Sequence, residues 1–342
     1  MKKQTLITGG AGFIGSNYAD HLLGQNKQVM IYDNLSRRGA DKNLEWLRKK
    51  HGAESFELVI ADVRSADQIE AAARNADVIA HLAGQVAVTS SVEDPRMDFE
   101  ANALGAFNVL EAARLSGRKP FLLYSSTNKV YGGMEDSKII EQDNRYVYAD
   151  LPKGVSEAQP LDFHSPYGCS KGAADQYVRD YSRIYGIPTV VFRQSSIFGQ
   201  RQFGIEDQGW LAWLVIAAVL GKPITIFGDG KQVRDLLEVR DLVRAYDAAV
   251  EKGEEVAGEV FNIGGGPQNT LSIWQEFGPM LEEMLGRDIN VSWDKARPGD
   301  QKVYISDIRK VKKKLDWSPK ISVDQGAKDY VNWVQANNAL FA

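Results

Sequence analysis

A glycine turn between an apolar run and a helical pattern is the feature that most constrains the fold of this chain. Residues 4–8 are apolar and strand-like, and glycines follow at positions 9, 12 and 15. In this spacing Gly9 allows a tight turn, Gly12 lets the backbone approach a pyrophosphate, and Gly15 lets helix and strand pack closely. The first N–H groups of the helix then point at the anion. The turn therefore predicts a dinucleotide-binding strand–helix unit.

An acidic residue supports this interpretation. The next apolar run ends at Asp33, at the place where a carboxylate accepts hydrogen bonds from the adenosine ribose diol and repels a 2′-phosphate. The position favours NAD over NADP, although Arg37 and Arg38 nearby weaken that preference. A turn that uses glycine for packing alone stays the alternative.

Strands and helices alternate through the first half of the chain, which predicts a parallel sheet covered on both faces, a Rossmann-type doubly wound α/β fold. Further strands are expected at 55–60, 77–82 and 121–124, and helices at 65–75 and 95–116. The second half is less regular, with one more strand near 259–263 and amphipathic helices. We expect residues 1–194, with 238–267, to form the NAD-binding domain. Residues 195–237 and 268–342 are expected to form a smaller α/β lobe that binds substrate.

Composition excludes several other classes. The 342 residues carry a net charge of −4, which argues against a general nucleic-acid or anionic-membrane surface. A single cysteine, Cys169, leaves no disulfide framework and no cysteine-based zinc site, and the histidines have no metal-like spacing, so no metal is expected. The N-terminus does not resemble a signal peptide, and the longest apolar run, 210–220, is too short to span a membrane. These features predict a soluble cytoplasmic protein.

Tyr167 and Lys171 share one helical face, because they lie four positions apart in a segment that begins a helix. Lowering a tyrosine pKa from about 10 to about 7 requires about 4 kcal/mol. An ammonium about 4 Å away supplies about 4 kcal/mol at an effective dielectric constant of about 20. The positive nicotinamide ring of NAD adds to this effect, so the pair is sufficient to produce a phenolate.

Taken together, these motifs resemble the extended short-chain dehydrogenase/reductase family over essentially the whole chain. The matching residues occur in the family's order: the glycine turn, Asp33, Asp62-Val63, His81 to Gly84, Asn102, Ser125 to Thr127, Val130 to Gly132, Tyr167 and Lys171. The resemblance implies that Thr127 holds the reacting sugar oxygen and Tyr167 is the acid/base. It also implies that Lys171 holds the ribose and lowers the tyrosine pKa.

The resemblance also implies two binding sets. The NAD-binding residues are expected to be Gly9, Gly12, Phe13, Ile14, Gly15, Asp33, Asn34, Ser36, Arg37, Asp62, Val63, Leu82, Ala83, Gly84, Gln85, Asn102, Ser125, Tyr167 and Lys171. The substrate-binding residues are expected to be Thr127, Asn128, Lys129, His164, Gln194, Ser195, Arg201, Arg234, Arg297 and Asp300. Within these, Arg234 and Arg297 suit a substrate pyrophosphate, because a guanidinium is planar and always charged.

The segment SSTNKVYG, residues 125–132, separates this chain from the sugar dehydratases of the family. Those enzymes place an Asp-Glu pair after the hydroxyl residue, whereas Asn128 and Lys129 stand here. Neither an amide nor an ammonium replaces a carboxylate as an acid or base at neutral pH. That leaves an epimerase or a simple dehydrogenase. The chain is most similar to the epimerases that invert C2 of CDP-activated hexoses, such as CDP-paratose, through a 2-keto intermediate.

Gln194 departs from the pattern of those 2-epimerases, in which a histidine is expected. The preferred sugar can therefore differ. Two alternatives stay open: a 4-epimerase or net dehydrogenase of another nucleotide sugar, and a non-catalytic NAD-binding regulator. A homodimer or homotetramer is also expected, since Leu104, Val109 and Leu110 lie on the long helix that often forms a four-helix dimer contact in the family.

Overall fold

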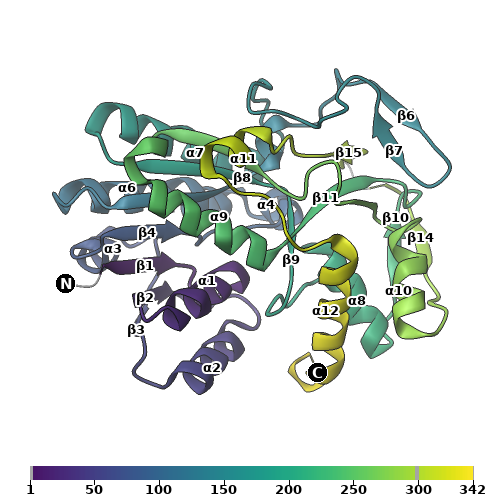
Figure 1. Cartoon of the computed structure of the whole chain (residues 1–342), viewed down its shortest axis with the longest axis horizontal. Helices are drawn as coiled ribbons and strands as arrows, with labels where there is room; N and C mark the ends of the chain where they lie inside the picture. The colour runs from purple at the N-terminus through teal and green to yellow at the C-terminus, as the bar shows by residue number, and fades with distance from the viewer. Residues whose placement is uncertain (1–2, 297–299, 342) are drawn as a thin grey trace.

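A seven-stranded parallel sheet forms the framework of the chain in this computed structural model, which describes residues 3–296 and 300–341 (Figure 1). The strand order is β12-β8-β5-β4-β1-β2-β3. The strands span β1 Gln4–Thr8, β2 Gln28–Asp33, β3 Glu57–Ile60, β4 Val78–His81, β5 Phe121–Thr127, β8 Thr189–Gln194 and β12 Glu259–Ile263. The predicted doubly wound parallel sheet is confirmed.

Helices cover both faces of this sheet. One face carries α1 Phe13–Gly24, α2 Ala40–His51, α9 Val239–Lys252 and α11 Arg309–Leu315. The other carries α3 Ala66–Ala73, α6 Gly105–Leu115 and α7 Ser165–Tyr185, with the short α4 Val88–Glu93 and α5 Pro95–Phe99 packed against α7. Each face has its own cluster of buried apolar side chains, so every strand except the edge strand β3 is buried on both sides, as the near-continuous apolar runs predict.

The second half of the chain, together with residues 139–148, builds a smaller lobe beside the carboxyl ends of the strands. Its four-stranded sheet consists of β9 Ser196–Phe198, β11 Val233–Glu238, β13 Thr270–Ser272 and β15 Val303–Tyr304. Two-stranded sheets are β10 Thr225–Phe227 with β14 Ser292–Asp294, and β6 Ile139–Glu141 with β7 Tyr146–Tyr148. The lobe's helices are α8 Trp210–Leu220, α10 Phe277–Leu285 and α12 Val323–Ala336. Single short turns are η2 Asn128–Tyr131, η3 Gly253–Val256 and η4 Asn338–Leu340.

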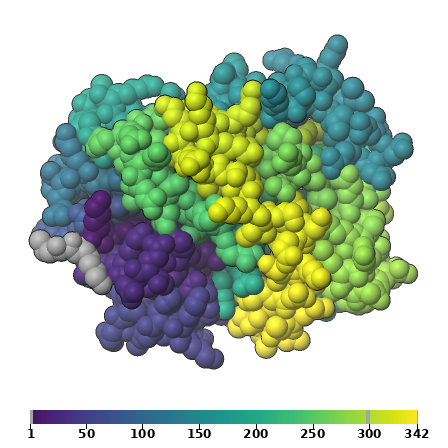
Figure 2. All heavy atoms as spheres, viewed as in Figure 1, coloured from purple at the N-terminus to yellow at the C-terminus, as the bar shows by residue number. Residues whose placement is uncertain are grey.

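The packing crosses the predicted domain division in two places. Val130 to Val155 belong in sequence to the first domain, but Tyr131 and Tyr146 pack in one apolar cluster with Val233 and Tyr304 of the second. The C-terminal segment touches both parts: Val311 of α11 joins the core under the large sheet, whereas α12 packs on α8. Figure 2 shows this segment in yellow, running across the visible face. The division itself stays a prediction.

Two six-residue strands escaped the sequence analysis, β8 of the large sheet and β11 of the lobe. β8 (TVVFRQ) and β11 (VRDLLE) are fully buried, and β8 lies between β5 and β12. The β-branched run after Pro188 was the available signal for β8. The strands that were expected end within about three residues of their predicted limits, and β5, which continues to Thr127, differs most.

The predicted long helix, 95–116, is present with a π-helical segment, η1 Glu100–Leu104, in its middle. One part of the prediction for this helix is wrong: Val109 and Leu110 are fully buried under the sheet and cannot contact another copy. Leu104 is exposed as expected, together with Phe99 and Phe107.

Helix α8 matches the predicted buried helix, since it is apolar on all sides and most of its side chains are inaccessible to solvent. Across residues 3–296 and 300–341, none of the helices is both long and apolar enough to cross a membrane.

Candidate active site

The glycine turn has the shape that a dinucleotide requires. Gly9 has a φ of +70°, and a Cβ there would lie 2.7 Å from the Ala83 backbone nitrogen. A Cβ on Gly15 would lie 2.2 Å from the Gly9 oxygen, so only glycine fits at either position. A Cβ on Gly12 would meet only that same oxygen, at 3.1 Å, which leaves its other side open. No side chain caps α1, whose first N–H groups are therefore available to an anion.

Asp33 has a second task that the sequence did not reveal. Its Oδ2 accepts a hydrogen bond from the Ala11 N–H at 2.9 Å, and its Oδ1 accepts one from the Leu35 N–H at 2.8 Å. Burial raises the pKa of Asp33, and these backbone hydrogen bonds act in the opposite direction. The carboxylate that is expected to meet the ribose therefore also fixes the glycine turn.

The predicted adenosine residues lie together beyond β2 and β3. Asn34 Nδ2 donates to Asp62 Oδ2 at 2.8 Å, and the Arg64 guanidinium donates hydrogen bonds to both oxygens of the same carboxylate. The Arg64 hydrogen bond is the main reason that the pKa of Asp62 falls to about 2, so this group stays a carboxylate. Val63 is buried, and Ser36 and Arg37 lie on the exposed loop after β2.

A cavity of about 220 Å³ opens at the carboxyl ends of β4, β5 and β8, between the large sheet and the lobe. It brings together many of the predicted residues: Phe13, Ile14, Leu82, Gly84, Ser125, Thr127, Tyr167, Lys171, Gln194 and Ser195. It also includes residues that the sequence analysis did not single out: Val86, Ser126, Ser196, Ile197, Phe198, Gln202, Gln208 to Ala212, and Leu236. Ligands of open α/β sheets bind at this edge.

Thr127, Tyr167 and Lys171 all line this cavity and are nearly inaccessible to solvent. Strand β5 continues to Thr127, beyond the apolar run, and so delivers its hydroxyl into the cavity. That hydroxyl hydrogen-bonds the phenol of Tyr167, which would favour a phenolate. Lys171 Nζ donates to the Ser125 carbonyl at 2.5 Å and lies 4.4 Å from the centre of the Tyr124 ring.

The pKa of Tyr167 differs from the prediction. Burial raises it to about 12, and the Thr127 hydrogen bond offsets only part of that rise. Lys171 does not act on the phenol here, because its ammonium is directed at the Ser125 carbonyl and the Tyr124 ring. Burial also lowers the pKa of Lys171 to about 8. Desolvation therefore outweighs the lysine in the protein alone, and the predicted lowering of the tyrosine pKa is wrong for these contacts.

Asn102 shapes the loop after β4. Its Oδ1 accepts a hydrogen bond from the Gln85 N–H at 2.9 Å, and a Cβ on Gly84 would lie 2.5 Å from that oxygen. Ala83 N–H donates to Thr8 Oγ1 at 3.3 Å. These contacts hold the Ala83–Gln85 backbone against the glycine turn, so Asn102 acts on the cofactor site by fixing this loop.

A polar cluster of predicted substrate residues lies at the η2 turn, directly after Thr127, and none of its members is part of the cavity wall. Arg234 Nη2 donates to Asp300 Oδ1 at 2.6 Å, and Lys129 Nζ donates to Gln301 Oε1 at 3.5 Å. Asn128 Nδ2 reaches the same Gln301 oxygen at 3.4 Å. Burial lowers the pKa of Lys129 to about 8, and the Arg234 charge acts in the same direction. Gln301, which the sequence analysis missed, thus connects the η2 turn to the lobe.

Gln194 lies at the end of β8, paired in register with Thr127 of β5. Its Nε2 donates to Ser125 Oγ at 2.9 Å and to the Tyr246 hydroxyl at 2.6 Å. Next to it, the Ser195 hydroxyl is hydrogen-bonded to Asp235 of β11. The departure from the expected histidine therefore lies in the wall of the cavity.

Three predicted substrate residues are placed differently. His164 is an exposed residue just before α7, 3.0 Å from the Asp162 carboxylate, and is not part of the cavity wall. Arg201 stacks between two indoles, 4.2 Å from the ring centre of Trp46 and 5.4 Å from that of Trp333. Arg297 lies outside the described residues.

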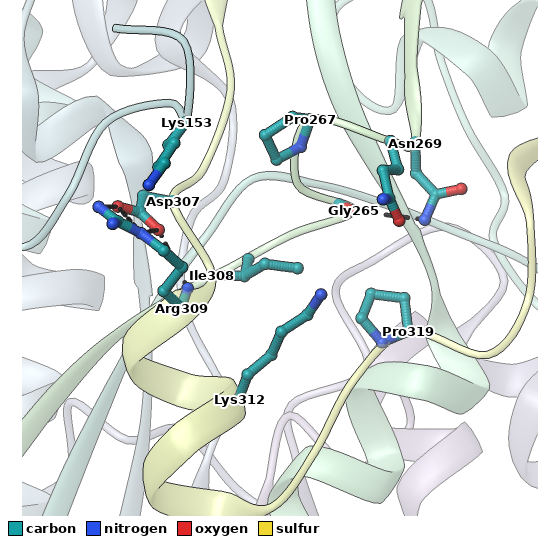
Figure 3. A pocket seen from close by; sticks show the side chains of 10 residues that line it. Lys153, Gly265, Pro267, Asn269, Asp307, Ile308, Arg309, Lys312 and Pro319 are labelled. Atoms are coloured by element: carbon teal, nitrogen blue, oxygen red, sulfur yellow. Dashed lines mark hydrogen bonds and ion pairs between the residues drawn. The ribbon is translucent and has the colours of Figure 1, made fainter.

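A second hollow, of about 190 Å³, lies on the surface between the loop after β12 and the start of α11. In Figure 3 the Lys312 side chain points into it, with Pro267 and Pro319 as walls. Asp307 already binds Arg309 there, at 2.9 Å between Oδ1 and Nε. None of the predicted site residues lines this hollow. In the described ranges, no group of three or more His, Cys, Asp or Glu could hold a metal, and the expectation of no metal stays a prediction.

Comparison with known proteins gives the family. The family described as GDP-mannose 4,6 dehydratase matches residues 6–330. The chain belongs to the extended short-chain dehydrogenase/reductase family. It is 45% identical over 338 residues to a CDP-paratose 2-epimerase of Salmonella typhi, covering 97% of this chain and 99% of that one.

Solved structures of the family agree with the fold. A Thermotoga maritima UDP-glucose 4-epimerase with UDP-glucose gives a TM-score of 0.83 at 30% identity, over 98% of this chain and 99% of that one. DesIV, a dTDP-glucose 4,6-dehydratase of Streptomyces venezuelae with NAD and TYD bound, also gives 0.83, at 27% identity and 98% of each chain. As a member of this family, the protein is an NAD-dependent enzyme of nucleotide-sugar chemistry, which sets aside the non-catalytic regulator.

The residues present fit NAD. The open side of Gly12, the uncapped α1 N-terminus and the Asp33 carboxylate form one continuous edge beside Phe13, Ile14 and Gly84 of the cavity wall. These groups would hold the pyrophosphate, the adenosine ribose and the nicotinamide end in that order.

Proposed function

We propose that this enzyme inverts C2 of a CDP-activated hexose, either CDP-paratose to CDP-tyvelose or a pair such as CDP-glucose and CDP-mannose. The observation that carries the proposal is the combination of an intact Thr127, Tyr167 and Lys171 with Asn128 and Lys129 directly after Thr127. The 45% identity to a CDP-paratose 2-epimerase, against about 30% to dTDP-glucose 4,6-dehydratases, supports the same choice.

The side chains after Thr127 argue against elimination of water. Asn128 has no ionisable proton, and Lys129 with a pKa of about 8 is mostly an ammonium at pH 7. Loss of water from a sugar needs a carboxylate base and a proton donor at this place. Oxidation followed by reduction needs neither, and the residues for it are present.

Direct deprotonation at C2 is closed, because no carbonyl adjoins that carbon and its C–H is not acidic. NAD, when bound, supplies the acceptor for the C2 hydride and its return to the opposite face of the 2-keto sugar. Burial alone keeps Tyr167 a phenol, so it acts as a base only when the positive nicotinamide ring of bound NAD stabilises its phenolate. In that form Tyr167 takes the proton of the C2 hydroxyl and later gives it back. Thr127 donates a hydrogen bond to the oxygen on which charge develops, and this stabilises the charge where it forms. Lys171, whose ammonium donates to the Ser125 carbonyl, is available to hold the ribose of bound NAD.

Turnover in deuterated water tests the route. The purified protein is incubated with CDP-paratose, without added cofactor, and the product is analysed by NMR. We expect CDP-tyvelose with hydrogen at C2, because the hydride never leaves the site. Substantial deuterium at C2 would overturn the redox route, and no product would overturn the proposed substrate.

A second candidate is a 4-epimerase of another nucleotide sugar, favoured by 33% identity to a putative UDP-glucose 4-epimerase of Methanocaldococcus jannaschii. Parallel assays of CDP-paratose, CDP-glucose and UDP-glucose separate the two. Inversion of UDP-glucose alone would select the 4-epimerase. Accumulation of NADH on addition of NAD would select a net dehydrogenase, the remaining alternative.

A homodimer is part of the proposal. Phe99, Leu104, Phe107 and Tyr177 expose large apolar side chains on the π-containing helix and on α7, and the Phe107 and Tyr177 rings lie 5.9 Å apart. An apolar surface of this kind fits the same surface of a second copy. Sedimentation should show a dimer that Phe107→Glu dissociates, whereas a monomeric wild-type protein would contradict it. A cytoplasmic location stays a prediction.

A further inference from the structure

Behind Lys171 lies a buried carboxylate, Asp98, that the reaction as described does not use. Asp98 belongs to α5 and is fully inaccessible to solvent. Its Oδ2 accepts a hydrogen bond from Ser170 Oγ at 2.5 Å, and its Oδ1 accepts one from Asn102 Nδ2 at 3.1 Å. A fully buried carboxylate is costly unless it is paired or well hydrogen-bonded, so its position calls for a partner charge.

The π-helical segment brings this network together. An extra residue in the turn Glu100–Leu104 places Asn102 so that its amide donates to both Asp98 and Ser170 while its oxygen holds the Gln85 N–H. Such π turns occur often at functional sites. Ser170 precedes Lys171 in sequence, and its Oγ also lies 3.2 Å from the Tyr167 carbonyl oxygen. The network therefore holds the helical turn between Tyr167 and Lys171 in place.

The other charged groups around Lys171 are already satisfied. Asp175 of α7 is bound by Arg193 through two hydrogen bonds, both of 2.9 Å. His81 of β4 is buried and its pKa falls to about 3, so it is neutral. Tyr124 of β5 and Tyr167 of α7 carry no charge near pH 7, because burial raises the pKa of each.

Asp98 therefore differs from Asp175: no arginine, lysine or histidine in residues 3–296 and 300–341 is ion-paired with it within 4 Å. Burial lowers the pKa of Lys171, and the charges of Asp175 and then Asp98 act in the opposite direction. Burial raises the pKa of Asp98, and the Lys171 charge acts in the opposite direction. Lys171 thus has one nearby carboxylate whose charge is not already matched by a cation.

We propose that Asp98 is a positioning residue, which keeps Lys171 protonated inside the cavity and fixes the Tyr167–Lys171 turn through Ser170. The inference rests on the proposed function for its catalytic meaning, but the charge of Lys171 can be measured without a substrate. Removing the Asp98 charge has two effects. The Lys171 ammonium becomes less stable, and a phenolate at Tyr167 becomes more stable. Both pKa values should therefore fall.

The test is Asp98→Asn, which keeps the size of the side chain and removes its charge. One of the two accepting oxygens becomes an NH2 donor, so one of the hydrogen bonds from Ser170 and Asn102 has to reverse or break. Lysine labelled with ¹³C at Cε is followed by NMR against pH in the NAD-bound protein, with Lys171→Arg identifying the Lys171 signal. We expect the Lys171 titration to move down by about one pH unit. The pH profile of kcat should move to lower pH in the same variant, rather than only shrinking in height.

Asp241→Asn is the matched control. Asp241 is another buried carboxylate, at the start of α9, which accepts hydrogen bonds from the Lys320 and Ile321 N–H groups. Unlike Asp98 it is ion-paired, with Arg244, and it is not among the charges that act on the pKa of Lys171. It should lower stability without moving the Lys171 titration. Ser170→Ala removes the hydrogen bonds that hold the turn but keeps the Asp98 charge. It should therefore lower kcat without moving the pH profile of kcat.

An unchanged Lys171 titration in Asp98→Asn, with the variant folded by circular dichroism, would overturn the inference. If the titration moves but the wild-type protein turns over no CDP-sugar, the inference stands and the proposed function fails. The two failures are therefore distinguishable.

Discussion

The two ends of the proposed site are built in different ways. At the proposed reacting end, Thr127 comes from a strand in the middle of the large sheet, and Tyr167 and Lys171 come from one helix packed on it. At the proposed recognition end, which is not part of the cavity wall, Lys129, Arg234 and Asp300 come from three distant segments and meet across the boundary between the sheet and the lobe.

The difference indicates which part of the fold sets reaction rate and stability, and which part sets substrate affinity. The reacting side chains are held by buried regular structure, whose geometry the family shares as a whole. The recognition side chains sit on a turn, a short strand and a loop, which can change without disturbing the large sheet. We therefore expect substitutions at the reacting end to affect rate or stability, and substitutions at the recognition end to affect affinity.

Tyr167→Phe should have the largest effect, because it removes the proton acceptor and leaves the ring in place. We expect kcat to fall by about 10³-fold. NAD content, measured by absorbance after denaturation, should be unchanged. More than a tenth of the wild-type activity would show that Tyr167 is not the acid/base.

Arg193→Met tests the buried support of the reacting end. Arg193 and Asp175 are only 3% and 0% exposed, and the substitution leaves the carboxylate without its cation. Unfolding in urea, followed by tryptophan fluorescence, should show a loss of about 3 kcal/mol. Arg118→Met breaks the exposed pair with Asp77 and should cost less than about 1 kcal/mol. Equal losses would mean that burial does not distinguish the two pairs.

Arg234→Met tests the recognition end. If the guanidinium binds the substrate diphosphate, the variant loses a charge-assisted hydrogen bond, and the Kd for CDP should rise at least about tenfold. Affinity for NAD should stay within twofold by calorimetry. Lys231→Met, three residues earlier and paired with the exposed Glu141, is the control and should change neither value. A similar loss in both variants would remove Arg234 from the site.

The smallest effect is expected in the pH dependence of CDP binding. Burial lowers the pKa of Lys129 to about 8, so its ammonium is present below that pH and is lost above it. The Kd for CDP should therefore rise a few-fold between pH 7 and pH 9. Lys129→Gln should bind more weakly at pH 7 and show a flatter profile. An unchanged profile would place the phosphates away from Lys129.

Much of the reacting end could be predicted, because local sequence sets it. The spacing of Gly9, Gly12 and Gly15, and the four-residue step from Tyr167 to Lys171, are short-range patterns that one turn or one helix converts directly into geometry. The same is true of β1, β2 and β5, whose apolar runs are nearly continuous. The failures lie at β8 and β11, where short strands interrupt a less regular stretch.

Long-range contacts decided the rest. His164 and Arg201 are near candidate segments in sequence, but their partners are Asp162 and two tryptophans that no local pattern indicates. Asp98 gave no signal at all, since its partners are a serine 72 positions away and an asparagine shifted by a π turn.

The sequence by itself determined most of the large sheet, the shape of the glycine turn and the shared helical face of Tyr167 and Lys171, because each depends on residues close together in the chain. Only the tertiary structure decided how these groups are charged and which of them meet. The pKa of Tyr167 shows the reason. This tyrosine lies four residues before a lysine in sequence, yet burial removes water from its hydroxyl and raises its pKa.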